Sequence, residues 1–160
     1  MLTELKKHNI IIDGEFTLKS GKKSKIYVDL KKIISYPKLH LQLCNELIAK
    51  INQSNKLICG TPYGAVPFAS YISISETIPM VFLRKETKTH GTKKLLEGDF
   101  SKGDTVVLIE DVITTGQSVI ETAEKLEEQG LIVSQIISVV SRCDKPLLYN
   151  SIPVEYLYHF

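Results

Sequence analysis

One stretch decides the fold of this chain: Val107-Leu-Ile-Glu-Asp-Val-Ile-Thr-Thr-Gly116. The apolar run over residues 105–109 predicts a buried strand, which ends in the two carboxylates Glu110 and Asp111. A short turn rich in hydroxyls and glycine follows, and a helix is predicted from about Gln117. Ligands of open α/β sheets bind at the carboxyl ends of the strands, so paired acids at this point favour a binding site over an ordinary capped turn.

The turn and the helix that follow the two acids suit a phosphate group. Turn amides and the N-terminus of a helix both present unsatisfied N–H groups and a positive dipole end. The carboxylates of Glu110 and Asp111 can hold the hydroxyls of a ribose or help to hold a hydrated metal ion. The combination predicts a site for a phosphorylated sugar where the strand turns into the helix.

Length and composition indicate a single globular domain over residues 1–160. The chain is 43% hydrophobic and 24% charged, which suits one domain with a full core. Its formal net charge of +2 predicts no general attraction to nucleic acid or to an anionic membrane. No stretch has the length of a membrane span, and no signal peptide is evident. The cysteines are widely spaced, without a Cys-x-x-Cys pair, which favours a reducing, cytoplasmic setting: Cys44, Cys59 and Cys143.

The rest of the sequence predicts strands that alternate with helices. Helices are predicted over 1–8, from Ser35 as the cap to about Ile51, over Val66–Ser73, and over Gln117–Gln129. Strands are predicted over Phe16–Leu18, Lys25–Leu30, Leu57–Gly60, Pro79–Leu83, Thr105–Ile109, Leu131–Val140 and Val154–Tyr158. Alternation of this kind, with strands that are apolar throughout, is typical of a parallel sheet covered on both faces. The predicted fold class is α/β, doubly wound.

The segment from Arg84 to Gly98 has no period and is strongly basic. A long unpatterned loop in a compact domain is usually functional or disordered, and a solvated charged loop is the common alternative. Its cationic and hydrogen-bonding groups are Arg84, Lys85, Lys88, His90, Lys93 and Lys94. Because it follows an apolar strand, in a parallel sheet it would start at the same edge as Glu110. We interpret it as a basic lid for a ligand with several phosphates.

Three further candidates are ambiguous when each is taken alone. Gly60-Thr-Pro-Tyr-Gly64 closes a strand and fits a phosphate-binding turn and a plain tight turn equally well. Arg142 follows another strand and could bind a carboxylate through its two-pronged guanidinium, although a lone arginine is more often a surface residue. Lys19 lies in a basic turn, and its role is equally ambiguous from the sequence.

Several familiar sites are missing from the sequence. There is no Walker-type phosphate loop, no Gly-x-Gly-x-x-Gly, no Gly-x-Ser-x-Gly and no cluster with zinc spacing. A Walker-type NTPase, a dinucleotide dehydrogenase, an α/β-hydrolase and a zinc enzyme are therefore disfavoured. The remaining histidines, His8, His40 and His159, are expected to be structural or exposed.

Taken together, these segments resemble the type I phosphoribosyltransferases. Residues 108–118 match the motif with which that family binds 5-phosphoribosyl 1-pyrophosphate (PRPP), and the motif names the donor only. Residues 16–21, residues 84–91, and Gly60-x-Pro-Tyr63 followed by Pro67 resemble the orotate phosphoribosyltransferase branch, particularly the form found in bifunctional uridine monophosphate synthases. The resemblance spans about residues 10–144. It implies a mostly parallel central sheet, a small N-terminal hood over about residues 1–35, and synthesis of orotidine 5′-monophosphate for pyrimidine (UMP) biosynthesis.

The resemblance also implies a role for individual residues. PRPP contacts would come from Lys19, Tyr63, Gly64, Arg84, Lys85, Lys88, His90, Glu110, Asp111, Val112, Ile113, Thr114, Thr115, Gly116, Gln117 and Ser118. Orotate contacts would come from Lys19, Tyr27, Val28, Thr114 and Arg142. Lys88, His90 and Asp111 would act in catalysis. Mg²⁺ would be held mainly by the pyrophosphate and the sugar hydroxyls, and Arg84, Lys88 and His90 would reach the site from the neighbouring subunit of a homodimer.

Some positions depart from the family pattern, and other functions stay open. Gly64 stands where many bacterial members carry lysine, and Ser141-Arg-Cys-Asp144 replaces the usual Asp-Arg-x-Glu. The chain also stops at Phe160, where relatives usually continue. One alternative is a phosphoribosyltransferase for another base. Another is a non-catalytic regulator that binds nucleic acid through the lysines at 19, 22, 23, 25, 31 and 32.

Overall fold

The computed structural model describes residues 1–17, 21, 23–84 and 95–160. Its main feature is a seven-stranded sheet with strand order β5-β4-β3-β6-β7-β9-β8. The strands are β3 (Leu57–Gly60), β4 (Met80–Leu83), β5 (Leu96–Glu97), β6 (Thr105–Ile113), β7 (Ile132–Ser141), β8 (Leu148–Tyr149) and β9 (Ile152–His159). The five strands from β4 to β9 along this order are parallel, and only the short edge strands β5 and β8 run antiparallel to their neighbours. The predicted α/β class with a mostly parallel sheet is confirmed.

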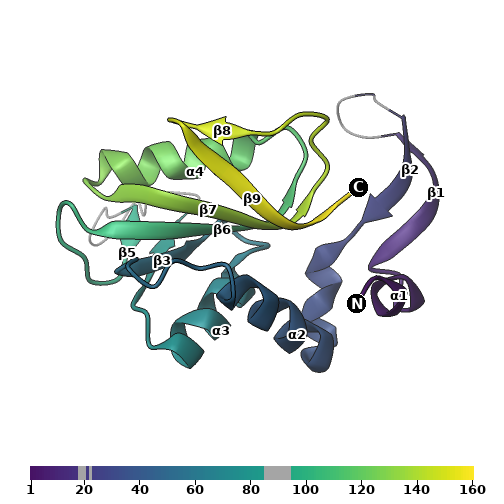
Figure 1. Cartoon of the computed structure of the whole chain (residues 1–160), viewed down its shortest axis with the longest axis horizontal. Helices are drawn as coiled ribbons and strands as arrows, with labels where there is room; N and C mark the ends of the chain where they lie inside the picture. The colour runs from purple at the N-terminus through teal and green to yellow at the C-terminus, as the bar shows by residue number, and fades with distance from the viewer. Residues whose placement is uncertain (18–20, 22, 85–94) are drawn as a thin grey trace.

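Helices cover both faces of the sheet (Figure 1). Helices α2 (Pro37–Ile48) and α3 (Val66–Glu76) lie on one face, and α4 (Gln117–Glu128) lies on the other. Alternate residues of β6 accordingly enter two separate apolar clusters: Val107 and Ile109 pack with α2 and α3, whereas Val106 and Leu108 pack with α4. Because successive side chains of a strand point to opposite faces, a continuous apolar run is needed to fill both clusters.

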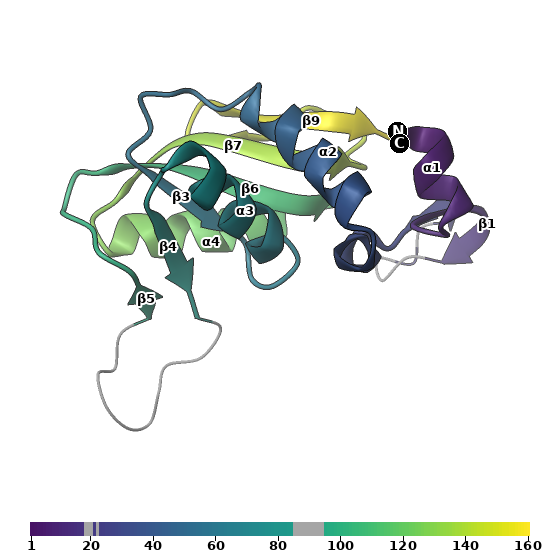
Figure 2. The same ribbon diagram turned by 90° about the horizontal axis from the view of Figure 1, so that it is seen from below.

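A small N-terminal unit stands at the carboxyl ends of the central strands (Figures 1 and 2). It consists of α1 (Leu2–Lys7), the antiparallel pair β1 (Ile11–Thr17) and β2 (Lys23–Val28), and the 3₁₀ helix η1 (Leu30–Ser35). Buried residues of this unit, among them Leu5, Ile10 and Ile33, join the cluster on the α2–α3 face. The unit is the hood that the resemblance implies, and its apolar side is part of the main core.

Several predicted boundaries were wrong. Strand β6 continues to Ile113, so Glu110 and Asp111 lie inside the strand and not at its end. Ser35 is not the cap of α2: it ends η1, and Tyr36 takes the cap position without a side-chain hydrogen bond. Strand β1 begins at Ile11, five residues before the predicted start. The two-residue strands β5 and β8 are too short to leave a period in the sequence.

No helix among the described residues combines the length and the apolar character that crossing a membrane requires.

Candidate functional site

Three loops meet at the carboxyl ends of neighbouring parallel strands. The parallel register sets Gly60 of β3 beside Ile109 of β6, and the backbone N–H of Thr61 donates to the carbonyl of Ile109 over 2.9 Å. On the other side of β6, the N–H of Arg142 donates to the carbonyl of Ile113 over 2.8 Å. The turn after β3, the end of β6 and the loop after β7 therefore share one edge of the sheet, as predicted for Arg142.

Glu110 is buried and braces the end of β6. Only 3% of the surface of Glu110 is exposed. One of its carboxylate oxygens accepts a hydrogen bond from the N–H of Asp111 at 3.0 Å, and the other accepts one from the hydroxyl of Ser118 at 2.8 Å. Burial, followed by the neighbouring carboxylate of Asp111, raises the pKa of Glu110 to about 8. Glu110 thus ties the strand to the first turn of α4, and Asp111 is the acid that keeps some exposure.

Two glycines allow the turn after β3 to approach the strands closely. A Cβ atom on Gly60 would lie 2.7 Å from the backbone of Ala65, and one on Gly64 would lie 2.1 Å from a carboxylate oxygen of Asp111. Real Cβ atoms do not come this near to other atoms. The turn therefore folds back over its own strand and rests its backbone against Asp111. The peptide bond between Pro62 and Tyr63 in this turn is cis.

The turn between β6 and α4 presents backbone N–H groups. Gly116 is the N-cap residue with φ +83°, which favours glycine, and the cap has no side-chain hydrogen bond. Exposed residues surround it, namely Thr114, Thr115, Gln117 and Ser118. The N–H of Gln117 donates to the hydroxyl of Thr115 over 3.4 Å. An uncapped N-terminus of a twelve-residue helix, beside exposed hydroxyls, is suited to an anion.

Arg142 extends from the end of β7 to the hood. Its Nη2 atom donates to the hydroxyl of Ser24 at 2.5 Å and to the carbonyl of Ile26 at 2.9 Å. This contact brings Arg142 next to the predicted orotate residues Tyr27 and Val28. Tyr27 and Val28 point in different directions, however. Val28 packs against the core cluster, whereas Tyr27 is 43% exposed, and the centre of its ring lies 5.4 Å from the centre of the Phe16 ring.

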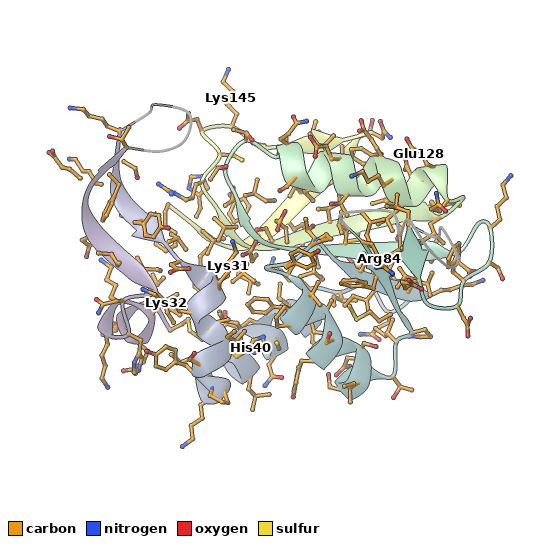
Figure 3. All side chains as sticks on the ribbon, turned by 180° about the vertical axis from the view of Figure 1, so that it is seen from behind. Lys31, Lys32, His40, Arg84, Glu128 and Lys145 are labelled. Atoms are coloured by element: carbon orange, nitrogen blue, oxygen red, sulfur yellow. The ribbon has the colours of Figure 1, made fainter. Side chains whose placement is uncertain are left out.

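Arg84 lies at the other side of the molecule from the hood (Figure 3). It follows β4, whose carboxyl end shares the sheet edge with β3 and β6, as predicted. Its N–H donates to the carbonyl of Leu95 over 2.9 Å, and its guanidinium forms an ion pair of 2.9 Å with Glu97. Arg84 thus joins the two ends of the predicted lid segment. Lys19, Lys85, Lys88 and His90, which were predicted to bind ligands, lie outside the described residues.

Asp111 is the acid of this region that could help to hold a metal ion. Within them, no group of three or more His, Cys, Asp or Glu side chains is placed to bind a metal ion. Both oxygens of Glu110 are hydrogen-bonded inside the protein, which leaves the partly exposed Asp111 as the nearby acid. Mg²⁺ characteristically binds through one or two carboxylates together with substrate phosphates and water, so this donor set is compatible with it.

Sequence reasoning missed the contacts of Ser24 and Cys143; it noted the hydroxyl of the turn at residues 60–64, but not that this hydroxyl is buried. Ser24 holds Arg142, and the alternation of exposed and inward residues over Lys23–Val28 could have placed it on the inner side of its strand. The hydroxyl of Thr61 is buried at the strand end without a hydrogen-bond partner among the described residues. The sequence holds no signal for that. The thiol of Cys143 also donates to the carbonyl of Thr114 over 3.1 Å, which links the loop after β7 to the turn after β6.

Comparison with known proteins places this arrangement in a family. Residues 34–150 match the family described as "Phosphoribosyl transferase domain". The chain is 42% identical over 132 residues to an orotate phosphoribosyltransferase of Caenorhabditis elegans, a match that covers 81% of this chain and 58% of that protein. It is 40% identical over 145 residues to an orotate phosphoribosyltransferase of Methanocaldococcus jannaschii, covering 90% of this chain and 82% of the relative.

The fold comparison agrees with the sequence comparison. The crystal structure of orotate phosphoribosyltransferase from Aeropyrum pernix superposes with a TM-score of 0.82 at 28% identity, over 100% of this chain and 94% of that one. The chain spans a smaller part of some relatives: 58% of the C. elegans protein and 28% of the uridine 5′-monophosphate synthase of Bos taurus, to which it is 44% identical over 134 residues. The chain belongs to the type I phosphoribosyltransferase family, among the orotate phosphoribosyltransferases.

Proposed function

We propose that the protein transfers the phosphoribosyl group of PRPP to orotate, which yields orotidine 5′-monophosphate and pyrophosphate for UMP synthesis. The observation that carries the proposal is the edge of the sheet where Asp111 and the uncapped α4 N-terminus lie beside an arginine held against the hood. We call residues 110–118 the donor side of the site, and Arg142 with residues 24–28 the acceptor side.

The donor side is suited to a ribose 5-phosphate. The amides at the start of α4 and the hydroxyls of Thr114 and Thr115 would hold the phosphate, because helix N-termini bind anions through N–H groups and their dipole. The acid at Asp111 would accept hydrogen bonds from the sugar hydroxyls. Glu110 would hold the strand end in place through Ser118 and contact ligand less than its neighbour does, since only 3% of it is exposed.

The acceptor side is suited to a planar anion. A guanidinium can donate two parallel hydrogen bonds to a carboxylate, which orotate carries on its ring. Arg142 reaches the hood strand that bears Tyr27 and Val28. Arg142 and this strand would enclose the base between the hood and the sheet edge, where the loss of water strengthens the charged contacts.

The reaction needs positioning and charge stabilisation rather than a covalent nucleophile. The bond from the anomeric carbon to the pyrophosphate oxygen breaks, a bond from that carbon to a ring nitrogen of orotate forms, and the nitrogen loses its proton to solvent. Negative charge grows on the leaving pyrophosphate, so cations around it stabilise the transition state. Lys85, Lys88 and His90 are the proposed cationic and hydrogen-bonding groups, with the turn at Tyr63 and Gly64 beside the pyrophosphate.

Members of this family generally use Mg²⁺ together with PRPP. Bound beside Asp111 and the substrate oxygens, the ion would neutralise the pyrophosphate charge. The chain's own contribution would be to orient the donor through Asp111 and to keep the turn at Gly64 close enough for backbone contacts.

We further propose a cytoplasmic homodimer with shared sites, in which Arg84, Lys88 and His90 serve the neighbouring subunit. Arg84 lies on the opposite side of the molecule from the hood, and this separation from its own acceptor side supports a role at the site of the neighbouring subunit. Free cysteines at 44, 59 and 143 support a reducing compartment. Sedimentation that showed only monomer at working concentrations would contradict the shared site.

The decisive experiment follows the loss of orotate absorbance after PRPP and Mg²⁺ are added. We expect loss that depends on all three components, with release of one pyrophosphate per orotate consumed. A panel of adenine, guanine, hypoxanthine and uracil provides the control. Consumption of one of these bases in place of orotate would assign the protein to another branch of the family. Salt-dependent binding to RNA or DNA without turnover of any base would support the regulator instead.

A further inference from the structure

Strand β2 carries a hydrogen-bond network that the proposed reaction does not yet account for. Ser24, Ile26 and Val28 form its less exposed side, and Lys23, Lys25 and Tyr27 form its exposed side. On the less exposed side the hydroxyl of Ser24 donates to the carbonyl of Ile26 at 2.8 Å and accepts from the N–H of Ile26 at 3.2 Å. Arg142 then donates to both the hydroxyl and the carbonyl.

The network uses every hydrogen-bonding position of the Ser24 hydroxyl and both hydrogens of Nη2 of Arg142. A serine hydroxyl has one donor and two acceptor positions. Its donor goes to the carbonyl of Ile26, and its acceptor positions go to the N–H of Ile26 and to Nη2 of Arg142. The two hydrogens of Nη2 are spent on Ser24 and on the carbonyl of Ile26. A saturated network of this kind, half-buried, holds its members in one geometry.

The consequence for Arg142 is a fixed guanidinium plane. Two contacts on Nη2 and the backbone bond of Arg142 to Ile113 hold the side chain at both ends. Both hydrogen bonds of the Arg142 side chain to the described residues start from Nη2. Since a guanidinium is rigid and planar, fixing one of its nitrogens also sets the direction of the other donors.

We propose that Ser24 is a positioning residue for acceptor binding: with the carbonyl of Ile26, its hydroxyl holds Nη2 of Arg142, so that Nη1 and Nε stay available for the carboxylate of the acceptor. The inference rests on the proposed function and adds to it a residue that contacts no substrate. It also explains how one arginine can join the hood to the sheet and bind a ligand, because the two tasks use different nitrogens.

Kinetics of Ser24→Ala, Ser24→Thr and a control test this role. Ser24→Ala removes the hydroxyl, and we expect the KM for orotate to rise about tenfold, with kcat and the KM for PRPP close to wild type, since an interaction that acts on binding alone appears in KM. Ser24→Thr keeps the hydroxyl and should restore most of the orotate affinity. Thr3→Ala removes an exposed hydroxyl from α1, elsewhere in the hood, and should behave as wild type.

A lower kcat with an unchanged KM for orotate in Ser24→Ala would overturn the proposal. So would a Ser24→Thr variant as impaired as Ser24→Ala. The cycle with Arg142→Ala adds a second criterion, because residues that act through one another are non-additive. We expect the Ser24→Ala change to have no further effect on the KM for orotate once Arg142 is absent, and additive effects would contradict the shared network.

Hydrogen exchange tests this inference independently of the proposed function. We expect Ser24→Ala and Arg142→Ala each to lower the protection of the amides in residues 23–28, and the double variant to lower it no further. If wild type consumes no orotate, the proposed function fails, and this measurement still decides whether the network holds Arg142. Unchanged exchange in both single variants would overturn the network itself.

Discussion

The donor side of the site comes from one continuous segment, residues 110–118, whereas the acceptor side joins Arg142 to Ser24, which are 118 positions apart in the chain. The first is fixed by a strand, its turn and the helix that follows, all packed into the central sheet. The second depends on how the hood docks onto the sheet. The donor side should therefore tolerate damage to the hood, and the acceptor side should respond to changes in either unit.

The largest expected effect comes from a residue of the predicted lid. Lys88→Ala removes a proposed partner of the leaving pyrophosphate, and we expect kcat to fall by about 10³, in the range of a lost transition-state contact. Circular dichroism and thermal unfolding should match wild type. An unchanged kcat would remove Lys88 from catalysis.

Gly64→Ala tests the donor side alone. The new Cβ would lie 2.1 Å from an oxygen of Asp111, so the turn or the carboxylate must move. We expect kcat/KM for PRPP to fall by about tenfold to a hundredfold, as for a displaced contact, while the KM for orotate changes little. Steady-state kinetics with each substrate varied measures this. An equal rise in the KM for orotate would show that the two sides are not separable.

Gly103 provides the matched control, because a Cβ atom added there would meet open space. Gly103 has a positive φ of 89° and no neighbouring atom within 4 Å. Gly103→Asn, which tolerates such a φ, should leave both kinetic constants as in wild type. Impaired kinetics there would mean that glycine replacement acts through stability and not through Asp111.

The pH dependence of stability tests the raised pKa of the buried Glu110. Its pKa is raised in the folded state from 4.5 to about 8, so the folded protein binds a proton that the unfolded chain has released. This contribution is fully present below pH 4.5 and is lost as the pH rises towards 8. We expect the free energy of unfolding of wild type to fall across this window relative to Glu110→Gln, by a few kcal/mol at most. Denaturant titrations at several pH values measure the difference, and parallel curves would contradict the shift.

The smallest effect is expected at the Arg84–Glu97 ion pair. The two side chains are 26% and 42% exposed, and pairs with this much solvent contact contribute about 0.2–1 kcal/mol. A double-mutant cycle of Arg84→Gln and Glu97→Gln on thermal stability should give a coupling in that range. A loss of activity in Arg84→Gln that Glu97→Gln does not share would separate a ligand role of Arg84 from its pairing.

The parts that could be predicted from sequence are those with a short-range cause. The apolar run before Glu110 and the glycine at 116 indicate a strand, a turn and the start of a helix within twelve residues. The extension of β6 to Ile113 was missed because its pairing with β7, which continues to Ser141, overrides the local polarity of the acids. Ser35 was misassigned because a 3₁₀ turn satisfies the same local preferences as a cap.

The parts that could not be predicted depend on contacts across long stretches of chain. Nothing near Ser24 in the sequence indicates that its partner is Arg142. Likewise the need for glycine at 64, in the turn after β3, arises from Asp111 on the neighbouring strand β6. A resemblance to a family can name such positions, but their physical reasons appear only when the strands are assembled.

The thiol of Cys143 offers a practical way to watch the donor side. Cys44 and Cys59 are fully buried, and burial raises the pKa of each thiol to about 12, which makes them poor nucleophiles. Cys143 is partly exposed, and its sulfur lies 3.1 Å from the carbonyl of Thr114. A maleimide dye should therefore label the wild-type chain at one place, beside the β6–α4 turn. Its fluorescence would report phosphate binding without any engineered cysteine.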